Sequence, residues 1–377
     1  MKPLRLCYVG PAASVSLRRW AQWFAVRGHE TTVLTVEPAE AGLATGFRQV
    51  DLSASLGSRK LGRVASAMRL AATVRRLQPD VIHVHYLRGL AWGLLLGRVH
   101  PLVATPWGSD VLEEQGAFRE WYSKTLTSTV LARADLVTVH SSYMEEAVRP
   151  LMPPGRKAVR IGWGVDLALF RPGLDATSLR ARWRITPDRR ILFSPRLAQP
   201  FYNHDRVLRA LPLISEKIPE VVLVIAESHP DPPYVAALRR LADELGMAEQ
   251  VRFVGAIPHA DMPFWLTAAE AVVMIPSSDG MPNTLLETLA CGAVPVLSRL
   301  PQYAELITHG ENGWLIEPTE RGVADAIIEV LSIRGLRERA AKQNRALAEA
   351  VADQGKEMAR MDGWYRRLAE TRHAMRM

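Results

Sequence analysis

The chain of 377 residues is poor in cysteine and has no long apolar run, and both absences narrow its setting. Its two cysteines, Cys7 and Cys291, fall in segments that we expect to be buried, which indicates a reducing compartment. The longest apolar candidate, residues 90–97, is far shorter than the roughly 18 residues of a membrane span. The apolar stretch at residues 4–9 fits a first strand better than a signal peptide. We therefore expect a cytoplasmic protein.

Common signatures of metal and dinucleotide sites are also missing. The chain has no HExxH or DxD motif, and the loop at residues 10–14 does not follow GxGxxG. His83 and His85 share one face of an expected strand, but no third ligand of suitable spacing lies nearby. We interpret them as hydrogen-bonded strand histidines and expect no metal cofactor.

Positive charge is concentrated in the N-terminal half. Residues 1–165 carry 21 Lys and Arg against 12 Asp and Glu, whereas the remainder carries 26 against 27. A basic half suits a nucleic acid, an anionic membrane face or an anionic substrate, or is a solvated surface. No recognised module organises these residues, so we expect no nucleic-acid partner. The basic segment 59–77 mixes Arg with apolar residues, which leaves peripheral contact with an anionic membrane open.

Short β-branched runs alternate with longer amphipathic runs, which predicts an α/β protein with parallel sheets covered by helices. The alternation breaks in the Gly-, Pro- and Asp-rich segment 162–179 and then restarts. We expect two Rossmann-like, doubly wound domains, residues 1–165 and 166–352, whose strand ends face a cleft. Residues 353–377 are expected to form a helix that crosses back onto the first domain through Met358, Met361, Trp364 and Leu368.

Ligands of such sheets bind beyond the C-terminal ends of the strands, so the loops there are informative. The small-residue loop 10–14 can admit a phosphate or a sugar at a helix N-terminus. Arg196 follows the first strand of the second half, and its planar fork can hold two phosphate oxygens. Asn203 and His204 start the next helix, where backbone N–H groups favour anions. Trp107 either packs in the core or offers a stacking platform for a sugar.

Two carboxylates, Asp279 and Glu287, lie eight residues apart around an expected strand-to-helix turn. Pro282 suits the first helical turn, and the N–H groups near Thr284 and Leu285 would then face the ligand. Acids near a phosphate would repel it, so these two are better suited to accept hydrogen bonds from vicinal diols. The alternative is a capping Asp and a solvated helix Glu.

These features resemble the retaining GT-B glycosyltransferases of family 4, the glycosyl transferases group 1. Segment 276–292 is similar to the family's Glu-x7-Glu motif, with Asp279 in the first position. Further landmarks appear in order at 27–35, 79–85, 134–142, 164–172, 251–263 and 309–318. The resemblance implies metal-independent transfer of a hexosyl group from a nucleotide sugar, with a UDP-sugar as first choice, to an acceptor hydroxyl. The acceptor would be a sugar, glycolipid or lipid-linked carrier in cell-surface glycan or polysaccharide biosynthesis.

The resemblance also implies roles for matching positions. Glu287 would bind the donor ribose, Asp279 the hydroxyls of the transferred sugar, and Arg196 the diphosphate. These three form the expected catalytic set. The expected donor-binding set is Gly10, Arg196, Asn203, His204, Ile257, Asp279, Gly280, Met281, Pro282, Asn283, Thr284, Leu285 and Glu287, and the acceptor-side set is Ser14, His85, Trp107 and Asp110.

The sequence departs from the family pattern in three places. The first acid of the motif is Asp rather than Glu, and the Lys that usually follows the Arg is absent, so Asn203 or His204 would replace it. Trp107 stands where the family has a His near the reacting centre, so no catalytic His is assigned. Glu305 matches an acid of less certain role. A GT-B nucleotide-sugar epimerase and a non-catalytic nucleotide-sugar-binding partner remain as alternative functions.

Overall fold

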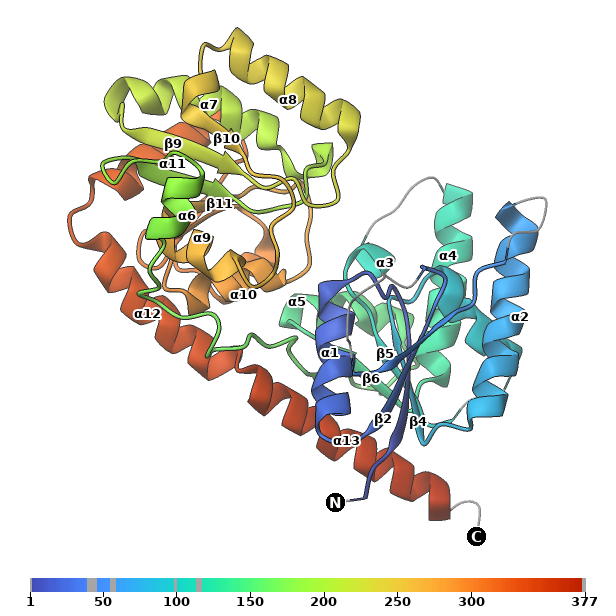
Figure 1. Cartoon of the computed structure of the whole chain (residues 1–377). Coiled ribbons are helices and arrows are strands. Elements are labelled where there is room, and N and C mark those ends of the chain that lie inside the picture. Colours follow the sequence, from blue (N-terminus) through green and yellow to red (C-terminus); the bar gives the residue numbers. More distant parts are fainter. Residues whose placement is uncertain (1, 39–45, 55–58, 98–99, 113–116, 375–377) are drawn as a thin grey trace. The chain divides into compact units, whose positions relative to one another are not determined.

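The computed structural model describes residues 2–38, 46–54, 59–97, 100–112 and 117–374 (Figure 1). The chain divides into two compact units. The first unit comprises Met1–Trp163 and Gly355–Met377, and the second comprises Gly164–Gln354. Among the described residues, no helix is both long and apolar enough to cross a membrane.

The first unit contains a seven-stranded parallel sheet in the order β3-β2-β1-β4-β5-β6-β7. Its strands are β1 (Arg5–Val9), β2 (Glu30–Thr35), β3 (Arg48–Asp51), β4 (Val81–His85), β5 (Leu102–Thr105), β6 (Leu136–Val139) and β7 (Val159–Arg160). Its helices are α1 (Val15–Val26), α2 (Arg59–Leu77), η1 (Gly89–Leu96), α3 (Ser109–Leu112), α4 (Ala117–Arg133), α5 (Ser142–Val148), η2 (Arg149–Leu151) and α13 (Gln354–Ala374). Strand β1 matches the strand expected at residues 4–9, and β3 is a short strand at the edge of the sheet.

The second unit contains a six-stranded parallel sheet in the order β10-β9-β8-β11-β12-β13. Its strands are β8 (Arg190–Ser194), β9 (Val221–Ile225), β10 (Val251–Phe253), β11 (Ala269–Met274), β12 (Pro295–Ser298) and β13 (Trp314–Ile316). Its helices are α6 (Thr177–Arg182), η3 (Pro200–Tyr202), α7 (His204–Lys217), α8 (Pro232–Glu244), η4 (Ala248–Gln250), α9 (Met262–Ala268), α10 (Asn283–Ala290), η5 (Pro301–Glu305), α11 (Glu320–Ser332) and α12 (Leu336–Val351). The predicted α/β class with two doubly wound parallel sheets is confirmed.

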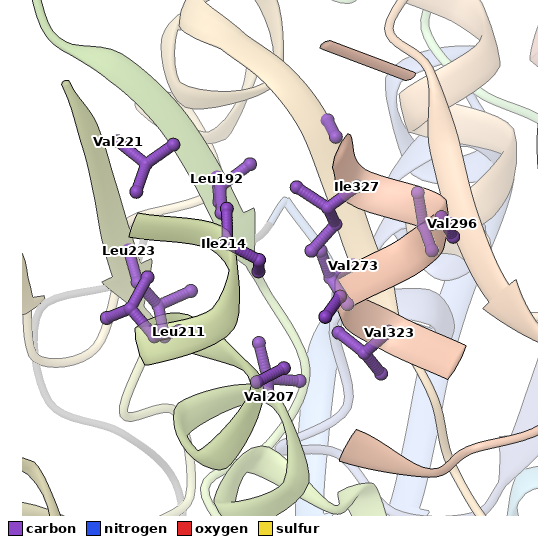
Figure 2. Close-up of a cluster of buried hydrophobic side chains, with 14 of the residues drawn as sticks. Leu192, Val207, Leu211, Ile214, Val221, Leu223, Val273, Val296, Val323 and Ile327 are labelled. Carbon is purple, nitrogen blue, oxygen red and sulfur yellow. The ribbon is translucent and has the colours of Figure 1, made fainter. Parts of the chain in front are cut away.

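Clusters of buried apolar side chains cover both faces of the second sheet. On one face, helices α7 and α11 pack side by side against the strands, as Figure 2 shows for Leu211 and Val323 with Leu223 and Val273. Each such fully buried aliphatic side chain contributes about 1.5–3 kcal/mol relative to exposure. On the other face, α9 and α10 bury Trp265, Leu285 and their neighbours. The loops at the strand ends therefore rise from a rigid platform.

Helix α13 belongs to the first unit, as the fold prediction stated. Its buried stripe is Met358, Met361, Tyr365 and Ala369, at helical spacing. The predicted Trp364 and Leu368 are half-buried and pack against the hydrophobic core of the first unit. The guanidinium of Arg367 lies over the ring of Trp364, at 4.0 Å. The predicted stripe therefore contacts the first unit, and Tyr365 and Ala369 are the buried residues that the apolar pattern did not include.

Tyr365 ties α13 to the sheet through hydrogen bonds. Its hydroxyl lies 2.5 Å from Nδ1 of His83 and accepts from the indole N–H of Trp20 at 3.1 Å. The other ring nitrogen of His83 lies 2.6 Å from the hydroxyl of Thr105. His83 is therefore a hydrogen-bonded histidine of a buried strand, as we predicted, and joins the C-terminal helix to the centre of the sheet.

The chain passes between the units twice, and the two passages are hydrogen-bonded to each other. Val165 N–H donates to the carbonyl of Ala352 at 2.6 Å, and Gln354 N–H donates back to the carbonyl of Val165 at 3.1 Å. Gly164 has φ +70°, and a Cβ there would lie 2.4 Å from Cα of Gln354, so only glycine fits.

Candidate functional site

The site of the second unit forms where its strand order reverses. The chain runs outward from β8 to β10, and then returns to place β11 on the other side of β8. Loops that leave the C-terminal ends of such neighbouring strands diverge and form a binding crevice. Arg196 follows β8 and Asp279 follows β11, so the fold brings together two side chains that are 83 residues apart.

Protein donors surround the Asp279 carboxylate. Its Oδ2 accepts from Nη2 of Arg196 at 2.8 Å and from the hydroxyl of Tyr303 at 2.9 Å, while Oδ1 accepts from the N–H of Gly280 at 2.9 Å. An ionised carboxylate offers about four acceptor positions, so the protein occupies three of them. Asp279 is thus the counter-ion of Arg196 as well as a candidate ligand for sugar hydroxyls.

Arg196 is a nearly buried cation, with a side chain that is 12% exposed. Burial alone would lower the pKa of its guanidinium, but the Asp279 carboxylate and the nearby Tyr202 and Tyr303 raise this pKa above its ordinary value. The ring of Tyr202 lies 4.7 Å from the guanidinium carbon. The Nε–H of Arg196 is buried and has no hydrogen-bond partner among the described residues.

Two residues of η5 brace Asp279, and sequence reasoning missed both. Gln302 donates its side-chain N–H to the backbone carbonyl of Asp279, and Tyr303 donates to the carboxylate. Burial raises the pKa of the Tyr303 hydroxyl well above its ordinary value, and the charge of Asp279 adds to this effect, so Tyr303 stays a donor. The acid assigned nearby, Glu305, is exposed. The signal available in the sequence was the position of Gln302 and Tyr303 just after β12, because β12 is the neighbour of β11.

Glu287 lies on α10 and is nearly buried. The residue is 5% exposed, and its Oε1 lies 3.1 Å from Nε2 of His259. The ring of His259 packs against Phe170, with ring centroids 5.1 Å apart. His259 lies in the loop after β10, within the segment 251–263 that carries the family resemblance, yet the sequence alone did not assign it a role.

The start of α10 corrects two further expectations. Pro282 is the residue before the helix, in an extended conformation, rather than part of its first turn. Leu285 N–H already donates to the carbonyl of Pro282 at 3.0 Å, so it is not available to an anion. Of the predicted pair of N–H donors, Thr284 remains. The other predicted donor-binding residues of this region are half-buried (Ile257, Asn283) or buried (Gly280, Met281).

The side chains of Asn203 and His204 are both hydrogen-bonded within the protein. The amide of Asn203 donates to the carbonyl of Ile275 at 2.8 Å and so ties the loop after β8 to the end of β11. His204 is fully buried between the hydroxyl of Ser194 and the carbonyl of Leu197. Burial lowers the pKa of its imidazole, so it is neutral at physiological pH and supplies no positive charge.

In the first unit, the loop after β1 already holds a carboxylate. Gly10 lies against β4, where a Cβ would come 2.7 Å from the carbonyl oxygen of His85. The N–H of Ala13 donates to Oε2 of Glu37 at 2.7 Å. Ser14 precedes α1 and makes no side-chain cap. A phosphate on this loop would have to displace Glu37.

The acceptor-side candidates serve the packing of the same unit. The carboxylate of Asp110 is buried and accepts from the N–H groups of Leu87, Trp107 and Gly108, so it organises the loop. The indole N–H of Trp107 donates to Nδ1 of His85 at 3.4 Å. His85 is fully buried, and burial lowers its pKa to about 3. The geometry gives no support for Asp110, Trp107 or His85 as an acceptor ligand, although Trp107 is partly exposed.

Comparison with known families resolves what kind of protein carries this site. Residues 175–347, which include Arg196, Asp279 and Glu287, match the model of the glycosyl transferases group 1. Residues 5–141 match the model of the glycosyl transferase 4-like family. The chain belongs to the glycosyl transferases group 1. Family membership, predicted from the motif around Asp279, is thus confirmed, and the Asp in place of Glu lies within a matched segment.

Curated relatives are about a quarter identical to this chain. The GDP-mannose-dependent alpha-(1-6)-phosphatidylinositol monomannoside mannosyltransferase of Mycolicibacterium smegmatis is 28% identical over 266 residues, which cover 67% of this chain and 66% of that protein. The D-inositol 3-phosphate glycosyltransferase of Mycobacterium bovis is 27% identical over 314 residues, covering 78% and 62%. The chain therefore spans about two thirds or less of the length of these relatives.

Solved structures share the fold over nearly the whole chain. Sucrose-phosphate synthase from Thermosynechococcus elongatus superposes with a TM-score of 0.82 at 21% identity, over 98% of this chain and 100% of that one. Anabaena HepE in complex with UDP and glucose gives 0.79 at 17% identity, over 97% and 100%. These likenesses, together with the two parallel sheets, establish the GT-B fold.

Proposed function

We propose that this glycosyltransferase transfers a sugar from a nucleoside diphosphate sugar to an acceptor hydroxyl, with the donor bound beside Arg196. The observation that carries the proposal is the nearly buried Arg196, whose unpartnered Nε–H lies at the strand-order reversal of the second unit. A departing nucleoside diphosphate develops negative charge, which a fixed guanidinium and a helix N-terminus stabilise. Arg196 and the start of α10 would supply both.

The other predicted site residues fit the remaining parts of such a donor. Glu287 would accept hydrogen bonds from the ribose diol, with His259 holding one carboxylate oxygen at 3.1 Å. Asp279 would contact the hydroxyls of the sugar. We further propose retention of configuration, with same-face attack by the acceptor and transfer of its proton to the leaving phosphate. A trapped covalent glycosyl-enzyme intermediate would contradict this pathway.

The donor nucleotide separates two versions of the proposal. The sequence favoured UDP, while the mannosyltransferase relative named above is GDP-mannose-dependent. Both versions are tested by the melting temperature of the protein with UDP, GDP, ADP, TDP and their sugars, since a ligand of the folded state raises it. We expect one diphosphate series to stabilise the protein. No shift with any of them would contradict a nucleotide-sugar donor.

We also propose a lipid-linked or phosphate-bearing acceptor presented at an anionic membrane surface. Helix α2 exposes Leu61, Val64 and Met68 at helical spacing, each about 60% exposed, beside the exposed Arg63 and Arg69. An apolar stripe flanked by arginines suits the boundary of an anionic bilayer. Flotation with anionic liposomes at low salt tests this. Binding should fall in a Leu61→Ser/Met68→Ser variant, and wild-type protein that stays unbound would contradict the proposal.

A further inference from the structure

Arg196 and Asp279 form an ion pair at the place where the proposed function puts the donor diphosphate, and this inference rests on that function. Asp279 lies 2.8 Å from the guanidinium that a diphosphate needs, and its side chain is only 14% exposed. At this distance a carboxylate competes with a second anion for the same cation and repels that anion. A donor that reaches Arg196 must therefore displace Asp279 or share Arg196 with it.

The surroundings of Asp279 allow displacement without disorder. Gln302 holds the backbone carbonyl of Asp279, Gly280 N–H holds Oδ1, and Tyr303 holds Oδ2. If Arg196 turns to the diphosphate, these three contacts still hold Asp279, two of them at its carboxylate. Oδ2 then loses one of its two donors and regains an acceptor position. That position suits a hydroxyl of the transferred sugar.

We propose that Asp279 is an internal competitor for Arg196 that the donor diphosphate replaces, and that Tyr303 is the positioning residue that retains Asp279 afterwards. In the unliganded state Asp279 neutralises the buried guanidinium. On donor binding the diphosphate takes over that role, and the released oxygen of Asp279 accepts from the sugar. Binding of the diphosphate and recognition of the sugar are thereby coupled through one carboxylate.

The test is the affinity of the full chain for UDP and GDP, measured by calorimetry in wild-type protein and in Asp279→Asn. Asn keeps the size of the side chain and accepts from Gly280 and Tyr303, but it cannot compete as an anion. We expect diphosphate affinity to rise about tenfold, with no gain for uridine or guanosine, while turnover with the donor sugar falls. Asp325→Asn removes an exposed carboxylate on α11 and serves as the matched charge control.

A second variant tests Tyr303. Tyr303→Phe removes a donor from Oδ2, which strengthens the hold of Asp279 on Arg196, so diphosphate affinity should fall severalfold. In the Asp279→Asn background the same substitution should lose that effect. Unchanged or weaker diphosphate binding in Asp279→Asn would overturn the inference. Wild-type protein that binds neither UDP nor GDP would instead overturn the proposed function.

Discussion

At the scale of single residues, this site is defined by which charged groups are already paired. The guanidinium of Arg196 is paired with the carboxylate of Asp279, and the carboxylate of Glu287 lies against His259. In the loop after β1, a backbone N–H donates to Glu37. The sequence could place Arg196, Asp279 and Glu287 after the right strands, because the strand periodicity is clear. It could not show the pairing, since contacts across 83 or 28 residues depend on strand order and helix rotation.

Arg196→Ala should reduce kcat/KM by a factor that corresponds to at least about 2 kcal/mol, as is typical for loss of a preorganised charge at a developing anion. Steady-state kinetics with the donor identified by thermal shift measures this loss. Arg206→Ala, which removes an arginine of α7 outside the proposed site, is the control. An unchanged kcat/KM in Arg196→Ala would contradict the diphosphate role.

Glu287→Ala should weaken nucleoside diphosphate binding, because the ribose loses its acceptor. His259→Ala should weaken it less, by about 1 kcal/mol, since it removes one hydrogen bond that orients Glu287. Calorimetric titration with UDP or GDP compares the two variants with His229→Ala, which alters an exposed histidine. Equal affinity in wild-type and Glu287→Ala proteins would refute the ribose assignment.

At the scale of elements, both units follow the predicted alternation of strands and helices, and the misses have physical causes. Strand β3, with the sequence RQVD, is short and half-exposed at a sheet edge, so it carries no β-branched run. On α13, Trp364 packs against the core but stays half-buried, with the guanidinium of Arg367 over its ring. Tyr365 was overlooked because its polar hydroxyl is satisfied only in the fold.

Tyr365→Phe should destabilise the docking of α13. The ring remains buried, but the indole of Trp20 and Nδ1 of His83 both lose their partner, and an unsatisfied buried polar group costs about 1–3 kcal/mol. We expect faster amide hydrogen exchange in α13 and β4, with exchange in β8 and β11 unchanged. Protection in α13 equal to that of wild type would show that these hydrogen bonds contribute nothing to docking.

At the scale of the whole molecule, buried neutral histidines make stability depend on pH. Burial lowers the pKa of His85 to about 3 and of His140 to about 4, whereas in the unfolded chain both lie near 6.5. As the pH falls below about 6.5, these two histidines bind protons in the unfolded state but stay neutral in the folded state. The free energy of unfolding should thus fall by up to about 1.4 kcal/mol per pH unit for each histidine, down to pH ~4.

Urea unfolding at several values between pH 7 and 4.5 measures this slope. His85→Leu should make the slope shallower, whereas His229→Leu, at an exposed position, should leave it unchanged. A pH-independent free energy of unfolding in the wild-type protein would contradict the assignment of these histidines as neutral.

The return of α13 has a consequence for how the chain is made. The second unit is one continuous segment, Gly164–Gln354, while the first unit is completed by residues that follow it. On the ribosome, the second unit can thus fold as soon as it has emerged. Trp20 and His83, in contrast, can form their hydrogen bonds to Tyr365 only after it is made, since it lies 345 and 282 residues away along the chain. Domains generally fold as units during synthesis. The unit that begins to be translated first is therefore completed last, because the contacts of Trp20 and His83 with Tyr365 form only after the whole second unit has been made.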